Sequence, residues 1–274
     1  MKRLNVFHET TYTFDQPVEL GQHRLLIRPR EGHDIRIESS SLNIQPLAVV
    51  KWHRDEFDNS VAIASFEGST RQLSIVSQVT VQHYDEWPLD FLVEDHAVTY
   101  PFAYNHDEQQ ALIPYLQFRP ETETTLFDQW TEQFTCTGDT ETYSLLSQIS
   151  QAIGSELNYC VREEPGVQTA HTTLSNQSGS CRDFAWLFMH TARKLGLAAR
   201  FVSGYLHDPA AEMADGATHA WAEVYLPGAG WKGFDPTSAR VTGAEHIATA
   251  VSVNPESIPP VSGKFTGPLD VNST

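Results

Sequence analysis

Apolar and polar residues alternate along the first 84 residues of the chain. The clearest run begins at Leu4 and reaches Phe14, and shorter runs of the same kind follow it. A period of two is typical of strands that bury one face. We therefore expect antiparallel strands near residues 4–14, 24–27, 34–44, 49–52, 61–66 and 73–84.

Turn-forming residues interrupt this alternation at regular intervals. Proline, glycine, aspartate and asparagine gather at residues 15–17, 28–32, 55–59 and 67–68, which is the composition of tight turns. No helical pattern is apparent before residue 88. Residues 1–88 are therefore predicted to form an antiparallel β-sandwich-like domain.

Helical spacing appears only in the second half of the chain. Residues 89–120 contain Pro101, Pro114 and Pro120 and are expected to be a connector between two domains. Beyond it, apolar residues recur every three or four positions at 126–134, 143–157 and 184–195, which predicts three amphipathic helices. Asp139 or Thr140 is the expected cap of the second.

Strand patterns return after these helices. Residues 198–206 form one expected strand, and residues 218–226 and 231–235 form a β-hairpin around Pro227-Gly228-Ala229-Gly230. Residues 251–253 and Phe265 are possible last strands. Residues 121–274 are thus predicted to be a core in which a helix packs on an antiparallel sheet, and the whole chain is of the α+β class.

Charge narrows the choice of partners. The chain has 274 residues, 35 of them acidic and 18 basic, which gives a formal net charge of −17. This charge disfavours nucleic acid and anionic membrane surfaces as partners. The first residues lack the apolar core of a signal peptide, and no run of about 18 apolar residues could span a membrane. A cytoplasmic location is the expectation.

One cysteine stands at a predicted helix start. Ser180 is a good N-cap, and Asp183 can reach back to it as in a capping box. Cys181 then occupies the first helical position, where backbone N–H groups and the helix dipole favour anions. We expect its thiol to ionise more readily than that of a free cysteine. The alternative is that Cys181 is packing material, since cysteine is among the most buried residue types.

A histidine and an aspartate stand at the open end of the predicted hairpin. His219 begins the first strand and Asp235 ends the second. If Gly228-Ala229-Gly230 were a plain three-residue turn, Asp235 would lie opposite Glu223, about 13 Å along the strand from His219 at 3.3 Å per residue. Contact between His219 and Asp235 therefore requires a shifted register or a β-bulge.

The remaining cysteines suggest no further chemistry. Cys136 and Cys160 form no Cys-x-x-Cys pair with each other or with Cys181, so we interpret them as structural and expect neither a disulfide framework nor a zinc knuckle. Cys181, His219 and Asp235 are all residue types that bind zinc, but their spacing is not that of metal ligands. We expect no metal and no cofactor.

Three short motifs resemble those of a known family. The chain carries Gly179-Ser180-Cys181-Arg182-Asp183, then His219-Ala220-Trp221, then Asp235-Pro236-Thr237. This order of Gly-x-Cys-x-Asp, His-Ala-Trp and Asp-Pro-Thr resembles the transglutaminase-like, papain-related superfamily. The resemblance implies a catalytic triad in which Cys181 is the nucleophile, His219 transfers the proton and Asp235 orients the imidazole.

The first domain is similar to the N-terminal β-domain of bacterial transglutaminase-like proteins. Thr11–Phe14, the segment from His23 to Arg30 and residues 55–59 carry the similarity, with Asp58 where the family usually has glycine. His23, Arg24, Arg28 and Arg30 could bind an anion or the second domain, and a solvated strand edge is the simpler interpretation.

The resemblance implies an enzyme that transfers an acyl group from an amide through a thioester on Cys181. With water as acceptor it is a cysteine protease or amidase acting on a peptide or protein, which the resemblance favours; with a primary amine it is a transglutaminase. A non-catalytic binding or scaffolding module is the contrasting hypothesis. The backbone N–H of Cys181 is one candidate oxyanion donor, and Asn176 or Gln177 could be the second.

Charges near the predicted site suggest one further possibility. Asp208, Glu212 and Asp215 lie just before His219 in sequence. An acidic loop beside the thiol would attract a cationic acceptor such as a lysine amine. The simpler interpretation is that these charges keep the loop in water.

Overall fold

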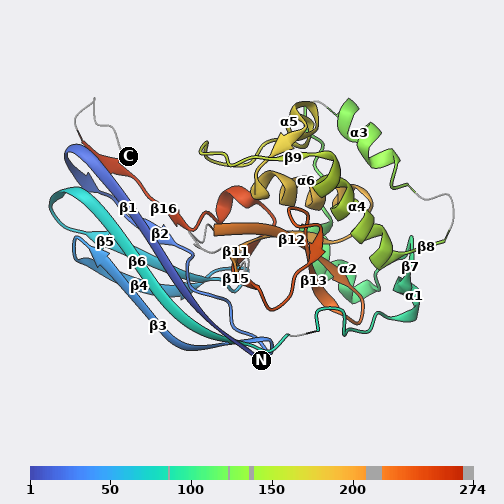
Figure 1. The fold of residues 1–274 in the computed structure, drawn as a ribbon, viewed down its shortest axis with the longest axis horizontal. Coiled ribbons are helices and arrows are strands. Elements are labelled where there is room, and N and C mark those ends of the chain that lie inside the picture. Colours follow the sequence, from blue (N-terminus) through green and yellow to red (C-terminus); the bar gives the residue numbers. More distant parts are fainter. Residues whose placement is uncertain (86, 123, 136–138, 208–217, 268–274) are drawn as a thin grey trace.

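Two four-stranded antiparallel sheets form the N-terminal part of the computed structural model, which describes residues 1–85, 87–122, 124–135, 139–207 and 218–267 (Figure 1). Their strand orders are β17-β1-β6-β3 and β16-β2-β5-β4. Six of these strands are β1 (Lys2–Leu20), β2 (His23–Leu25), β3 (Ile35–Gln45), β4 (Ala48–Arg54), β5 (Ser60–Phe66) and β6 (Ser69–His83). Phe14, Leu25, Leu73 and Ile75 form a buried core between the sheets, so the expected sandwich-like arrangement is confirmed.

One predicted turn is not a turn. Residues 15–17 do not end a strand, because β1 continues to Leu20. Its pairing with β6 is interrupted instead, with a register shift between Thr13 and Val18. Pro17 lacks an N–H for the ladder, so it is accommodated in this unpaired stretch of the strand.

The remaining two strands of the sandwich come from the far end of the sequence. β16 (Val261–Ser262) pairs with β2, and β17 (Phe265–Thr266) pairs with β1. Figure 1 shows this last segment crossing from the helical part of the molecule back to the sheets coloured blue and cyan. Residues 261–266 therefore pack with the N-terminal domain, although they follow the core in sequence.

The second part of the molecule is a five-stranded sheet with helices against it. The sheet order is β14-β13-β12-β11-β15, and every pairing in it is antiparallel. Its strands are β11 (Ala199–Leu206), β12 (Thr218–Leu226), β13 (Gly230–Asp235), β14 (Arg240–Val241) and β15 (His246–Ser252). The described short elements are β7 (Thr99–Tyr100), β8 (Thr140–Glu141), β9 (Asn158–Tyr159), β10 (Ser178–Gly179) and the 3₁₀ turn η1 (Pro255–Ser257).

A central helix packs on this sheet. The described helices are α1 (Asp95–Val98), α2 (His106–Leu116), α3 (Thr125–Glu132), α4 (Thr142–Glu156), α5 (Ala170–Asn176) and α6 (Cys181–Lys194). α6 buries Phe184 and Phe188 in one cluster with Ala222 and Phe234 of the sheet, and Phe188 stacks on Phe234. The predicted α+β class is thus confirmed.

Local details of helices α2 and α4 depart from the prediction. α2 lies inside the expected connector. Asn105 and Glu108 form a capping box that starts this helix, and Pro114 lies within it. α4 is preceded by Glu141 as its N-cap, and neither Asp139 nor Thr140 has that position. None of the helices in the described part of the chain has the length and hydropathy of a membrane span.

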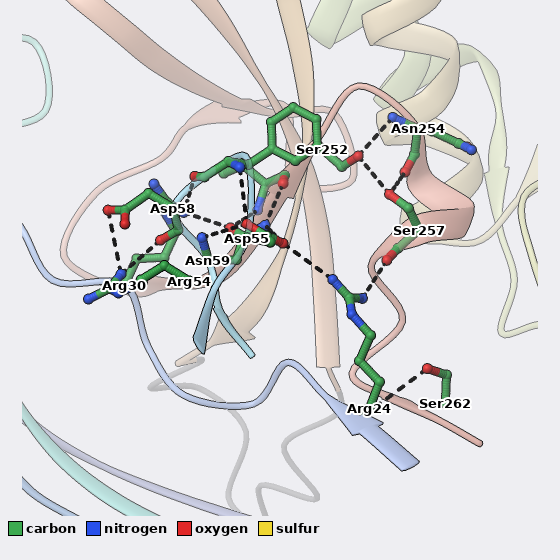
Figure 2. A network of polar contacts seen from close by, with 12 residues as sticks. Arg24, Arg30, Arg54, Asp55, Asp58, Asn59, Ser252, Asn254, Ser257 and Ser262 are labelled. Atoms are coloured by element: carbon green, nitrogen blue, oxygen red, sulfur yellow. Dashed lines mark hydrogen bonds and ion pairs between the residues drawn. The ribbon is translucent and has the colours of Figure 1, made fainter. Parts of the chain in front are cut away.

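A polar network joins the two parts (Figure 2). Asn59 is fully buried in the turn between β4 and β5. Its amide nitrogen donates to the carbonyl of Val251 and its oxygen accepts from the backbone N–H of Val251, both at 2.9 Å. The side chain therefore pairs with β15 much as a neighbouring strand would. Arg30 also donates to the Asn59 oxygen, at 2.6 Å.

Arg24 extends the same network. Its guanidinium donates to the carbonyl of Ser257 at 2.7 Å and to Asp55 at 3.2 Å. Asp55 in turn accepts from the backbone and side chain of Asn59. Of the possibilities left open for the basic residues 23–30, contact with the second domain is the one that the structure shows for Arg24.

Replacement of Asn59 by alanine should destabilise the protein strongly. The variant would leave the backbone groups of Val251 without partners at a buried junction. We expect a loss of about 3 kcal/mol in the free energy of unfolding, measured by urea denaturation. The exposed Asn43→Ala variant serves as control and should stay within about 0.5 kcal/mol of the parent. Equal effects of the two changes would contradict the role given to Asn59.

Candidate active site

The start of α6 is fixed by a buried carboxylate. Asp183 is fully buried and accepts hydrogen bonds from the backbone N–H and the hydroxyl of Ser180, at 2.8 and 2.7 Å. The predicted link between Asp183 and Ser180 therefore forms, with the hydroxyl as donor. Arg162 adds two hydrogen bonds to the same carboxylate, at 2.8 and 3.1 Å, and the N–H of Gln168 adds one at 2.7 Å.

This environment keeps Asp183 ionised. Burial acts to raise the pKa of Asp183, but the hydrogen bonds from Arg162, Gln168 and Ser180 outweigh it, so the pKa is lowered. Gly179 is required just before the helix, because a Cβ there would lie 2.8 Å from the Cβ of Asp183. Together these contacts hold Cys181, 8% exposed, at the first position of the helix.

The hairpin of β12 and β13 has the shifted register that contact between His219 and Asp235 requires. Leu226 pairs with Gly230, so the turn is residues 227–229, not 228–230. Gly228 and Gly230 both have positive φ, of 83° and 72°, which side-chain-bearing residues rarely adopt. Ala222 then pairs with Phe234, which places Asp235 level with Trp221, about 7 Å along the strand from His219. The shifted turn alone brings Asp235 within reach of His219, and no β-bulge interrupts the pairing of β12 with β13.

His219 and Asp235 are in direct contact. Nε2 of His219 lies 2.9 Å from Oδ2 of Asp235, and the aspartate is fully buried. The other oxygen, Oδ1, accepts from the backbone N–H of Thr237 at 3.0 Å. Oδ2 also accepts from the hydroxyl of Ser238 at 2.8 Å and contacts Nε2 of His246 at 3.3 Å.

The donors around Asp235 keep it negatively charged. Burial alone would raise the pKa of Asp235, but hydrogen bonds from His219 and His246 outweigh it and hold the pKa well below its usual range. His246 accepts a hydrogen bond from the N–H of Gly243 at its Nδ1, so its Nε2 carries the proton that faces Asp235.

His219 joins the aspartate to the cysteine. Its side chain is hydrogen-bonded to Asp235 and lines the same cavity as Cys181. Because Nε2 contacts Asp235, Nδ1 is the ring nitrogen that remains for another partner. Burial acts to lower the pKa of His219, but the hydrogen bonds to Asp235 and Cys181 outweigh it and raise the pKa to about 9. A raised pKa favours the protonated imidazole near neutral pH, which can donate a proton, whereas the neutral ring can accept one.

The same residues offer a set of possible metal ligands. One ligand atom each of His219, Asp235 and His246 lies within 4.8 Å of the others in the described part of the chain. Two histidines and a carboxylate suit zinc and other divalent transition metals. In the structure, both histidines are instead hydrogen-bonded to Oδ2 of Asp235, at 2.9 and 3.3 Å. Each of these side chains therefore has a hydrogen-bond partner without a metal.

Cys181 and His219 open into a cavity of about 430 Å³. One wall comes from the segment between β9 and α5, with Tyr159, Val161 and Arg162, and continues through Arg182 of α6. The other wall comes from the segment after β15, from Pro255 to Pro260. Oε1 of Glu256 accepts from the N–H of Val167 at 2.9 Å and so joins the two walls.

Sequence patterns did not reveal every residue of this site. His246 lies 11 positions after Asp235 on another strand, and no motif marks it. Neither Asn176 nor Gln177, the suggested oxyanion donors, lines the cavity described here. The acidic residues Asp208, Glu212 and Asp215, like Cys136, lie outside the described residues. Cys160 and Cys181 are free thiols.

Two family models match the chain. Residues 4–82 match the bacterial transglutaminase-like N-terminal region, and residues 128–236 match the transglutaminase-like superfamily. The second match contains Cys181, His219 and Asp235. The two matches together cover more than half of the chain, in the order that the sequence motifs predict.

Curated relatives match part of the chain. An uncharacterized protein of Mycobacterium leprae is 30% identical over 121 residues, which cover 41% of this chain and 41% of the relative. An uncharacterized protein of Mycobacterium tuberculosis is 36% identical over 99 residues, which cover 33% of this chain and 32% of the relative. The chain thus spans less than half the length of the curated relatives it matches.

A solved structure has the same fold. The crystal structure of a candidate cysteine protease from Cytophaga hutchinsonii superposes with a TM-score of 0.75, covering 99% of this chain and 87% of that chain, at 19% sequence identity. The superposition shows a shared fold. At this low sequence identity the comparison says nothing about a shared substrate.

The protonation of His219 can be measured directly. We expect its imidazole to lose its proton near pH 9, followed by NMR of the ring protons and assigned with a His219→Gln variant. In the unfolded chain a histidine has a pKa of about 6.5. The contact of protonated His219 with Asp235 therefore contributes its full stabilisation of the fold below about pH 6.5, and this contribution is lost as the pH rises through 9. Asp235→Asn should lower the pKa of His219 by about one unit or more. A midpoint near 6.5 in the parent protein would contradict this assignment.

Proposed function

We propose that this chain, which belongs to the transglutaminase-like superfamily and carries the bacterial transglutaminase-like N-terminal region, is a cysteine-dependent acyl-transfer enzyme. The observation that carries the proposal is the 2.9 Å contact between His219 and buried Asp235, in the cavity that Cys181 also lines. It supports a relay from Asp235 through His219 to Cys181. Such a relay supplies both an activated nucleophile and a group that returns the proton. The most suitable reaction is hydrolysis of an amide or peptide bond.

The first half of the reaction forms a thioester. The thiolate of Cys181 attacks the carbonyl carbon of the substrate, and the C=O electron pair moves onto oxygen to give a tetrahedral oxyanion. When this intermediate collapses, the C–N bond breaks and the leaving nitrogen takes the proton of the His219 imidazolium. The backbone N–H of Cys181 is among those at the start of α6 that have no acceptor within the helix, so it is suited to bind the oxyanion.

The second half releases the acyl group. Water, or a primary amine, loses a proton to neutral His219 as it attacks the thioester carbonyl. The C–S bond then breaks and the thiolate and imidazolium form again. Asp235 stays ionised throughout and holds the ring in place. Hydrolysis and amine transfer share every residue of this scheme and differ only in the acceptor.

Selective alkylation tests the nucleophile without knowledge of the substrate. With iodoacetamide from pH 4 to 9, we expect Cys181 to react well below pH 8 and faster than Cys160 or Cys136, because His219 stabilises its thiolate. A His219→Ala variant should lose this advantage. Reaction of Cys181 at the same rate as the other two thiols would instead favour the scaffolding alternative.

Turnover distinguishes the two reactions. A library of peptides containing glutamine or asparagine should be scored for ammonia release, for backbone cleavage and for incorporation of a fluorescent primary amine. Cys181→Ala should abolish every activity found, and Asp235→Asn should lower kcat by about 10³-fold or more while the fold is retained. An activity that survives Cys181→Ala would exclude this residue as the nucleophile.

The N-terminal domain contributes to the proposed site through the cavity wall. Arg24 holds the carbonyl of Ser257, which lies between two cavity-lining residues, Glu256 and Ile258. We expect Arg24→Met to raise KM several-fold with little change in kcat, because the wall moves but the relay does not. Arg3→Met removes an exposed arginine of the same domain and should change neither constant. A fall in kcat alone would contradict this division of roles.

A further inference from the structure

We propose that Arg182 forms a carboxylate-binding subsite beside the nucleophile, so that the enzyme prefers peptides with an acidic group near the scissile amide. This inference rests on the proposed function and adds a substrate class to it. The carboxylate could belong to an aspartate or glutamate side chain or to the C-terminus of a peptide. Both present negatively charged oxygens that accept charge-assisted hydrogen bonds from a guanidinium.

Arg182 is placed to meet a substrate. It directly follows Cys181 in α6 and lines the same cavity. Its Nη2 donates to the carbonyls of Arg162 and Glu164, each at 3.1 Å. These two bonds use both hydrogens of Nη2 and fix the plane of the group. The N–H groups on Nη1 and Nε remain for a ligand. Because each parallel pair of N–H groups on a guanidinium includes Nη2, a carboxylate would bind Nη1 or Nε through a single charge-assisted hydrogen bond.

The charge of Arg182 is not matched by a carboxylate. Arg162, which lines the same cavity, forms ion pairs with Asp183 and Glu164. Within the described residues, Arg182 forms hydrogen bonds to backbone carbonyls and no ion pair. In a chain with 35 acidic and 18 basic residues, a cavity-lining arginine with this set of partners is suited to an external anion.

The acidic residues of the cavity do not neutralise Arg182. Glu256 reaches across from the other wall and accepts from the N–H of Val167 at 2.9 Å. Neither Glu256 nor Glu163 forms an ion pair with Arg182 in the described part of the chain. Among the described residues, Arg182 therefore has no carboxylate partner and can offer its charge to a substrate.

Apolar groups around this charge would strengthen an ion pair. Val161, 81% exposed, stands on the same wall as Arg182, and Ile258 and Pro259 stand on the opposite wall. A peptide seated between them would displace water from the guanidinium, and a lower local dielectric increases the attraction. Hydrogen bonds to charged groups are also stronger than neutral ones.

Matched alkylating reagents test the subsite without a known substrate. Iodoacetate and iodoacetamide differ in a carboxylate, as do N-iodoacetylglycine and its glycinamide, which place the charge farther from the reactive carbon. In every case the sulfur of Cys181 forms a C–S bond and iodide leaves. We expect one or both acids to react faster relative to the matched amide in the parent protein, and this ratio to fall about tenfold in Arg182→Met. Arg182→Lys, which keeps the charge and loses the planar guanidinium with its hydrogen bonds to Arg162 and Glu164, should be intermediate.

The controls separate the possible failures. Arg36→Met removes an exposed, distant arginine and should leave both ratios unchanged. If Arg182→Met slows acids and amides equally, Arg182 only holds the wall and the subsite is overturned. If both ratios are unchanged in Arg182→Met, it is likewise overturned. If Cys181 shows no preferential reaction with any reagent, the proposed function itself fails.

Peptides then identify the source of the carboxylate. One pair should differ in glutamate or glutamine next to the scissile residue, and another in a free or amidated C-terminus. A higher kcat/KM for the charged member of the first pair, lost in Arg182→Met, assigns the subsite to a side chain; the same result with the second pair assigns it to the peptide terminus. Equal kcat/KM within both pairs overturns the proposal.

Discussion

The buried negative charge of Asp235 is the constraint on which the site depends. A carboxylate fully removed from water is strongly destabilising unless hydrogen bonds replace its hydration. Here four donors do so, from His219, Thr237, Ser238 and His246. They come from two strands and from the turn after β13. Satisfying one charge therefore fixes the position of the imidazole, and through it the approach to the sulfur.

The same physical solution recurs at two other places. Asp183 is buried at the start of α6 and gathers donors from Ser180, Arg162 and Gln168. Asn59 is buried at the junction of the two parts and pairs with Val251. Each buried polar group admits few arrangements of its partners, because every donor and acceptor must be used. The helix start, the hairpin and the domain junction are thereby fixed relative to one another.

The substrate cavity lies where these fixed elements meet. Its second wall leaves β15, passes Ser257 and continues into β16 of the N-terminal sandwich. The N-terminal domain thus contributes to the cavity without supplying a reactive group. Arg24 gives this domain a physical role through contacts that a solvated strand edge would not make.

The sequence by itself determined the elements and the chemistry at their ends. Alternation predicted the strands, and the Ser180–Asp183 cap placed Cys181 at a helix start, because such signals act between residues close in sequence. Helix α2 was not predicted, because Pro114 disfavours a helix. The capping box at its start stabilises the helix nevertheless. Only the tertiary structure decided the hairpin register, the contact of His246 with Asp235, the return of residues 261–266 to the sandwich and the orientation of Arg182. These depend on residues far apart in the chain, whose pairing is selected by burial and hydrogen-bond satisfaction over the whole molecule.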